Sequence, residues 1–290
     1  MGESPQNLES QAEKKLQGGF FSFLSGGARF DEACTLFVSA GNGYKLKKQW
    51  ENASKCYVRA AGLQSKLNDR NQEAGYYVEA GNITKKYSSA EAEKFYNNAI
   101  EIYLKEGRFT QSAKLLKGLA ELNVEQGNYE SGIKLYKRAS DYFEMDEHGT
   151  SSFSQCILKY ADLIARYQEN YTEAIKIYET EGKKAIGIKL LQYGAKEHFF
   201  KAGILHLLSG VGLFNLCFAV GASSEIALLR ELNSSLENRN VDTFVKAIEE
   251  FDRIHNLDNW KVHFLYLIKE SITEKEATVT MDEEGQIDFT

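Results

Sequence analysis

The fold is decided by residues 40–60, which read AGNGYKLKKQWENASKCYVRA, and by their counterpart at residues 80–99, which read AGNITKKYSSAEAEKFYNNA. The first stretch opens with Ala40-Gly41-Asn42, and this tripeptide returns 40 residues later as Ala80-Gly81-Asn82. Self-similarity at a fixed period is the sequence signature of a repeat architecture. We therefore expect structural units about 40 residues long.

A second pattern recurs at nearly the same interval. It is a small residue, a tyrosine four positions later and, in most copies, an alanine three positions after that. The copies are Ala53–Tyr57–Ala60, Ala92–Tyr96–Ala99, Gly132–Tyr136–Ala139 and the shorter Ala174–Tyr178. These spacings put all members on one helix face, where a small residue lets a neighbouring helix approach closely. The tyrosine fills the adjoining gap and keeps its hydroxyl at the edge. Four copies in phase argue against an ordinary bundle with chance alanine spacing.

Each unit is expected to be a pair of helices. Further amphipathic segments lie between the tyrosine copies, and turn signals such as Asn68-Asp69 and residues 105–107 separate them. The only proline is Pro5, which leaves the interior free to form long helices. Because one pair cannot bury its apolar face alone, the pairs must stack. The predicted fold is all-α: a twisted sheet of antiparallel helix pairs, resembling a solenoid of lengthened tetratricopeptide repeats.

The repeat fades from about residue 180, and an apolar stripe over residues 240–273 predicts a compact helical bundle that caps the stack. Residues 203–226 are apolar enough for a membrane span to be conceivable. Glycine and serine clusters interrupt them, so a buried helix and turn is preferred. The predicted parts are a polar N-terminal segment (1–19), an apolar loop (20–30), TPR-like repeats (31–180), a C-terminal helical bundle (181–273) and an acidic flexible tail (274–290).

Composition and missing motifs exclude several classes of function. The formal net charge of −6 argues against nucleic-acid binding. No secretory signal is evident, so the four cysteines are expected to be reduced and mostly buried. The sequence has no GxxxxGK[ST] phosphate loop, no Cys/His zinc spacing and no GxSxG elbow. We therefore predict a protein that is not an enzyme and takes no cofactor or metal.

Short strings in a fixed order carry a resemblance to a known family. They are FFSFLSGG (20–27), FDEAC (30–34), AIEIY (99–103), GRFT (107–110), KRASDY (137–142), YGAKEHFFKA (193–202), NVDT (240–243) and LDNW (257–260). Over most of its length the chain resembles the alpha-SNAP family. The resemblance implies a cytoplasmic adaptor, peripherally associated with membranes. It would be a monomer in solution, and several copies would wrap one SNARE four-helix bundle. These copies would recruit the hexameric AAA+ ATPase NSF. NSF would then disassemble the bundle in vesicle trafficking and membrane fusion. The alternative is a generic TPR-like scaffold that binds another helical or peptide partner.

An apolar loop is the first candidate site. It consists of Phe20, Phe21, Phe23 and Leu24 between glycines. Four large apolar side chains on a Gly/Ser-rich loop suit shallow insertion into a membrane surface, and the resemblance implies this use. The alternative is that these residues fold back on the first helix pair.

Basic residues near the repeat turns are the second candidate, for binding the acidic outside of SNARE bundles. They are Lys45, Lys47, Lys48, Lys85, Lys86, Arg108, Lys114, Lys117 and Lys159. A spacing of about 40 is expected to bring equivalent positions side by side. Arg108, Lys114 and Lys159 are similar to basic positions of the family, whereas Gln155 stands where the family has a lysine. The alternative is a solvated helix face.

The C-terminal region is the third candidate, for coupling to the ATPase. The residues assigned to it are Glu237, Asp282, Glu283, Glu284, Ile287 and Phe289. The family ends in an acidic run and a penultimate leucine, which is Phe289 here. Only Glu237 is acidic in residues 234–239, and a family arginine corresponds to Ser224. These departures imply weaker coupling or a co-adapted partner. The alternative is a disordered tail beside a plain cap bundle.

Overall fold

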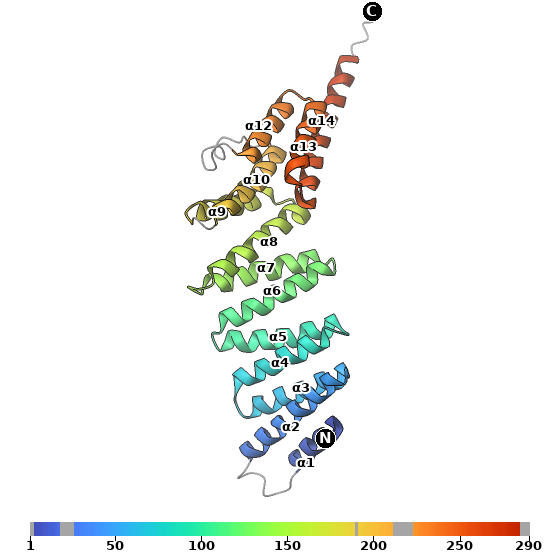
Figure 1. The fold of residues 1–290 in the computed structure, drawn as a ribbon, viewed down its shortest axis with the longest axis vertical. Coiled ribbons are helices and arrows are strands. Elements are labelled where there is room, and N and C mark those ends of the chain that lie inside the picture. Colours follow the sequence, from blue (N-terminus) through green and yellow to red (C-terminus); the bar gives the residue numbers. More distant parts are fainter. Residues whose placement is uncertain (1–2, 18–25, 189–190, 211–222, 285–290) are drawn as a thin grey trace, which may run out of the picture. The chain divides into compact units, whose positions relative to one another are not determined.

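In the computed structural model, the described residues are 3–17, 26–188, 191–210 and 223–284, and they form 13 helices and no strand (Figure 1). Side chains are not described at Gly26, Gln192, Tyr193 or beyond Thr273. The chain divides into two compact units, residues 1–153 and 154–290. The prediction of an all-α fold is confirmed.

The first unit is a stack of helices, each packed against the next one along the chain. The helices are α1 (Pro5–Leu16), α2 (Gly26–Leu46), α3 (Trp50–Lys66), α4 (Arg70–Thr84), α5 (Ser89–Lys105), α6 (Phe109–Glu125) and α7 (Tyr129–Glu144). From α2 onward they form the antiparallel, TPR-like pairs that the 40-residue period predicts. Helix α1 lies within residues 1–19, for which the sequence predicts only a polar segment. The Ser4 hydroxyl caps it, Pro5 opens it, and Ala12 is fully buried.

The two sequence repeats meet at one packing motif. The Tyr57 hydroxyl donates to the Asn42 side-chain oxygen at 2.8 Å, and a Cβ added to Gly41 would lie 2.9 Å from the Tyr57 ring. Tyr96 repeats this arrangement with Asn82, at 2.9 Å, and with Gly81. The glycine admits the ring and the asparagine accepts its hydroxyl, which explains why the tripeptide and the tyrosine recur together.

Four helix ends in this unit share one backbone turn. Its left-handed residue is Lys48, Asn68, Gly107 or Gly127. In each case the next N–H donates to the carbonyl five residues back, at 2.7 to 3.0 Å, as in the bond from Arg108 to Tyr103. This arrangement ends one helix and lets the next start at once in the opposite direction.

The second unit takes in α8 (Thr150–Gln168), whose first turn still belongs to the first unit. It continues with α9 (Tyr171–Ile186), α10 (Gln192–Ser209), α12 (Ser224–Glu237), α13 (Val241–His255) and α14 (Asn259–Glu284). Helix α10 packs against α9, α12 and α14, and buried aromatic side chains such as Phe199, Phe200 and Phe264 fill the core. The division falls inside α8, earlier than the predicted limit of residue 180.

Two segments differ in extent from their sequence-based description. Helix α14 continues through residues 274–284, where the acidic composition predicts a flexible tail. Of residues 203–226, the described parts end α10 at Ser209 and begin α12 at Ser224, and residues 211–222 lie outside the described residues. Within the ranges given above, no helix combines the length and apolar character needed to cross a membrane.

The cysteines that the structure describes are reduced and buried, as predicted. They are Cys34, Cys56 and Cys156. Burial raises the pKa of the Cys56 thiol to about 12, and Glu9 and Glu13 add to the effect. A thiol held in that form is a poor nucleophile. These residues therefore serve as small apolar side chains.

Candidate functional site

The nine basic residues proposed for SNARE binding all lie on even-numbered helices or in turns that flank them. Lys45 is on α2, Lys114 and Lys117 are on α6, and Lys159 is on α8 in the second unit. The remaining five lie in the turns after α2 and α4 and in the turn before α6: Lys47, Lys48, Lys85, Lys86 and Arg108. Lys45 and Lys117 are half-buried, and the other seven are exposed.

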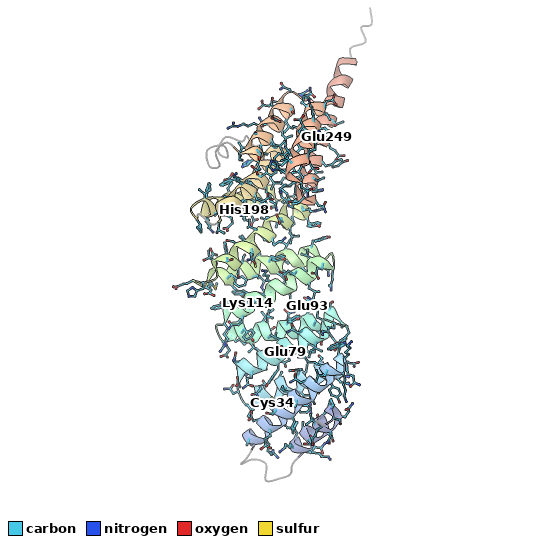
Figure 2. The ribbon with its side chains drawn as sticks, in the orientation of Figure 1. Cys34, Glu79, Glu93, Lys114, His198 and Glu249 are labelled. Carbon is cyan, nitrogen blue, oxygen red and sulfur yellow. The ribbon has the colours of Figure 1, made fainter. Side chains whose placement is uncertain are left out.

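The eight basic residues of the first unit span the stack instead of following one line. Because successive helices are antiparallel, the turns after α2 and α4 lie on one edge, whereas the turn before α6 lies on the opposite edge. Lys48 and Lys86 therefore share an edge that Arg108 does not. Lys114 lies about 9 Å along α6 from Arg108, at 1.5 Å per residue. Figure 2 shows Lys114 on α6, in the body of the stack.

Some of these cations already have partners. The Lys45 ammonium lies 3.3 Å from a Glu79 carboxylate oxygen, and the Lys86 ammonium lies 3.8 Å from the centre of the Trp50 ring. Trp50 is half-buried and contributes a cation–π contact as well as packing. The Thr110 hydroxyl and the His148 backbone N–H hold the pKa of Asp146 below its usual value, and Lys114 adds to this. Within the described residues, no carboxylate forms an ion pair with Arg108 or Lys114.

The odd-numbered helices carry a surface of different character. A groove of about 440 Å³ runs over α1, α3 and α5. Its charged lining residues are Glu9, Glu13, Glu51, Lys55, Arg59 and Glu91. Arg59 makes two hydrogen bonds to the Glu13 carboxylate, at 2.6 and 2.7 Å, and Lys55 pairs with Glu51. This groove is acidic on balance and its cations are paired, so it does not offer a basic surface to an acidic partner.

The comparisons with known proteins agree with this architecture. The family model described as soluble NSF attachment protein, SNAP, matches residues 3–273. The chain belongs to this family. It is similar to the alpha-soluble NSF attachment protein of Mus musculus, with 36% identity over 279 residues that cover 91% of this chain and 93% of the mouse protein. The Vitis vinifera protein of the same name is 32% identical, over 93% of this chain and 95% of its own length.

A fungal relative carries a more descriptive name. The probable vesicular-fusion protein sec17 homolog of Schizosaccharomyces pombe is 29% identical, over 95% of this chain and 99% of its own length. Proteins of the SNAP family are non-enzymatic adaptors, which confirms the prediction that this chain is not an enzyme.

The other two candidate sites of this SNAP-family chain lie largely beyond what the structure describes. Phe20, Phe21, Phe23 and Leu24 fall outside the described residues, as do Ile287 and Phe289. Glu237 is exposed and is the last residue of α12. Asp282, Glu283 and Glu284 form the end of α14, where only the backbone is described.

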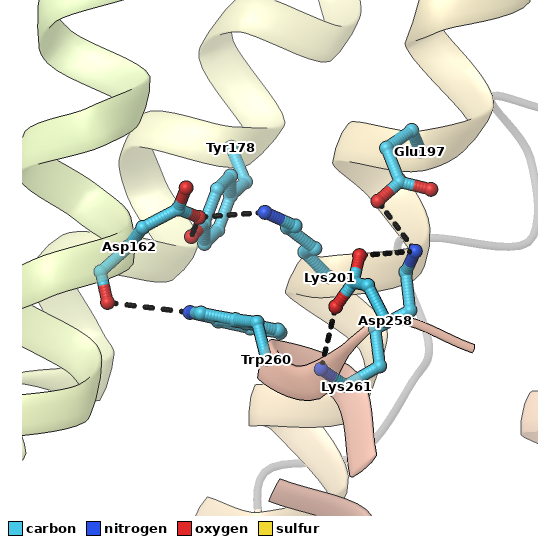
Figure 3. A network of polar contacts seen from close by, with 7 residues as sticks. All are labelled: Asp162, Tyr178, Glu197, Lys201, Asp258, Trp260 and Lys261. Atoms are coloured by element: carbon cyan, nitrogen blue, oxygen red, sulfur yellow. Dashed lines mark hydrogen bonds and ion pairs between the residues drawn. The ribbon is translucent and has the colours of Figure 1, made fainter. Parts of the chain in front are cut away.

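Sequence reasoning missed a group of polar residues in the second unit. Figure 3 shows Asp162, Lys201 and Trp260 brought together from α8, α10 and α14. A signal for one of them is present in the sequence, because Asp162 follows Ala161 much as Asn42 follows Gly41. Lys201 and Trp260 lie in the part of the chain where the repeat has faded, so no period points to them.

Proposed function

We propose that this chain is an adaptor that binds assembled SNARE four-helix bundles and recruits and stimulates the NSF hexamer, which disassembles them. The observation that carries the proposal is the set of exposed cations on α6 and in the turns that flank α2, α4 and α6, above all Arg108 and Lys114. An acidic helix bundle is attracted to such a surface, and its approach is steered by the same charges. The names of the relatives support NSF as the partner and vesicle fusion as the process.

The first test is SNARE disassembly on liposomes with purified NSF and ATP, with and without this chain. We expect disassembly that requires the chain. Binding to the SNARE bundle without disassembly would place the failure in coupling to the ATPase. Absence of binding would overturn the proposal and favour a TPR-like scaffold for another partner.

The basic surface is tested by reversing two of its charges. Arg108→Glu with Lys114→Glu is expected to weaken SNARE-bundle binding by about tenfold or more, because each substitution replaces an attraction with a repulsion. Lys94→Glu with Lys134→Glu is the matched control, since it changes the net charge equally but on odd-numbered helices α5 and α7, where both lysines are exposed. Equal loss of binding in both double variants would show that total charge, and not this surface, is responsible.

Two further parts of the proposal concern the chain ends. The apolar loop raises the adaptor's effective concentration at membranes that carry SNAREs. Phe20→Ser with Phe21→Ser is therefore expected to reduce disassembly on liposomes and to leave disassembly of soluble bundles unchanged.

The acidic end of α14 and Phe289 contact the ATPase, so Phe289→Ala is expected to lower ATPase stimulation without changing SNARE binding.

A further inference from the structure

Asp162 occupies the position that asparagine holds in the first two repeats, at Asn42 and Asn82. The Tyr178 hydroxyl donates to Asp162 Oδ1 at 2.6 Å, just as Tyr57 donates to Asn42 and Tyr96 to Asn82. Accepting this bond requires only an oxygen, which an asparagine amide supplies equally well. The negative charge at position 162 therefore calls for a different explanation.

That charge is met by Lys201 of α10. The Lys201 ammonium lies 2.6 Å from Asp162 Oδ1, and the two side chains are only 14% and 21% exposed. The ammonium also lies 4.8 Å from the centre of the Trp260 ring, and the Trp260 indole N–H donates to the Asp162 backbone carbonyl at 3.2 Å. Asp162, Lys201 and Trp260, which we call the clasp, thus join α8, α10 and the first turn of α14 (Figure 3).

A second contact holds the same turn of α14 to α10. The Lys261 ammonium lies 2.7 Å from Glu197 and 2.9 Å from Asp258. Burial opposes the charge on Lys261, but Glu197 and Asp258 outweigh it and raise its pKa. Glu197 and Lys201 are one helical turn apart on α10 and therefore share a face. Helix α10 thus holds the start of α14 at two points.

We infer that the clasp is a positioning device for ATPase coupling: it fixes the start of α14 to α8 and α10, so that a force applied at the acidic end of α14 acts on the second unit as a whole and is not lost in movement of this helix alone. This inference rests on the proposed function, which places the ATPase contact at that end. Removing one partner of a mostly buried charge pair leaves the other charge uncompensated, so loss of either Asp162 or Lys201 is expected to be costly.

The test is Asp162→Asn in the full chain. This variant introduces the residue of the first two repeats, keeps an acceptor for Tyr178 and keeps the backbone carbonyl for Trp260. We expect maximal NSF stimulation at saturating adaptor to fall about fivefold or more, while the affinity for the SNARE bundle changes less than about twofold. Backbone amides in the first turns of α14 are expected to exchange hydrogen at least about tenfold faster.

Two variants separate positioning from a general loss of structure. Trp260→Phe keeps an aromatic face for Lys201 but removes the N–H donor and part of the ring, so it should show the same pattern. Lys134→Gln removes a lysine from an exposed ion pair in the first unit and should leave both readouts unchanged. A parallel fall of SNARE affinity and stimulation in Asp162→Asn would indicate only a structural role and overturn the inference.

The inference and the proposed function fail in different ways. If the wild-type chain does not stimulate NSF, the proposed function is wrong, and the clasp as a coupling device is wrong with it. If the wild type stimulates NSF and Asp162→Asn stimulates it equally, with unchanged hydrogen exchange in α14, the clasp alone is refuted. A thermal melt on every variant shows that these comparisons are made between folded proteins.

Discussion

At the scale of single residues, the stack depends on positions where only a glycine fits. In α4 a Cβ on Gly81 would lie 2.8 Å from a carbon of the Tyr96 ring, and that ring is held in place by its bond to Asn82. Gly81→Ala is therefore expected to lower the free energy of unfolding by about 1–3 kcal/mol, although alanine is the better helix former. Urea denaturation measures the change.

The control for that substitution lies in the same helix. Nothing lies within 4 Å of a Cβ built on Gly75. Gly75→Ala is expected to stabilise the chain by about 0.5–1 kcal/mol, because the helix propensity improves and no clash opposes it. The same chemical change thus has opposite signs six residues apart. A neutral or stabilising Gly81→Ala would show that Tyr96 is not held as described.

A half-buried histidine makes stability depend on pH. Burial lowers the pKa of His198 on α10, although Glu181 and Glu197 oppose the effect. The unfolded chain takes up this proton near pH 6.5, while the folded chain resists it until the pH is lower. Stability therefore falls as the pH drops from about 6.5 toward the folded pKa. His198→Gln should flatten the dependence between pH 7 and 5 in urea titrations, whereas an unchanged slope would assign it to other groups.

This residue-level packing could be predicted from the sequence only in part. Helical spacing was enough to place Ala53 and Tyr57 on one face and to expect the tyrosine hydroxyl at its edge. It did not reveal Asn42 as the acceptor, because that bond depends on how closely two helices approach and at what angle. The contact of Lys201 could not be predicted for the same reason, since its partner Asp162 lies on a different helix.

At the scale of elements, one turn type ends several helices, and glycine is not always present where it fits best. Arg239 adopts a φ of 51°, and the next N–H, that of Asn240, donates to Ser235 at 2.9 Å, as at the ends with Gly107 and Gly127. Arg239→Gly is expected to raise the free energy of unfolding by up to about 1 kcal/mol. Arg230→Gly, inside α12, is the matched control and should lower it by about 1 kcal/mol. A destabilising Arg239→Gly would mean that its side chain makes contacts that outweigh the strain.

Helix pairs and most turns were predictable because apolar period and turn residues are local signals. Gly107 and Gly127 mark their helix ends in the sequence as well as in the structure. Helix α1 was missed because residues 1–19 are mostly polar, yet Ser4-Pro5 is a start signal that could have revealed it. The helical extension over residues 274–284 was missed because an acidic composition is typical of tails, although it is also compatible with a helix.

At the scale of the whole molecule, charge is distributed unevenly against a net value of −6. Sequence position alone placed the cations near repeat turns. It did not show that the turns after α2 and α4 lie on one edge and the turn before α6 on the other, or that acidic residues gather in the groove over α1, α3 and α5. Both features depend on how the helices pack against one another. The net charge therefore predicts repulsion of an acidic partner, whereas the local basic surface predicts attraction.

The dependence of binding on salt concentration distinguishes these two predictions. If the net charge governed the encounter with an acidic SNARE bundle, screening would reduce repulsion, and binding would strengthen as salt rises. If the exposed cations around Arg108 and Lys114 govern it, screening removes attraction, and binding weakens. We expect affinity for the soluble bundle to fall about tenfold between 50 and 300 mM NaCl, measured by titration calorimetry. Arg108→Glu with Lys114→Glu should abolish or invert this dependence, while Lys94→Glu with Lys134→Glu should keep it. Binding that strengthens with salt in the wild-type chain would exclude the basic surface as the SNARE site, whatever the family resemblance implies.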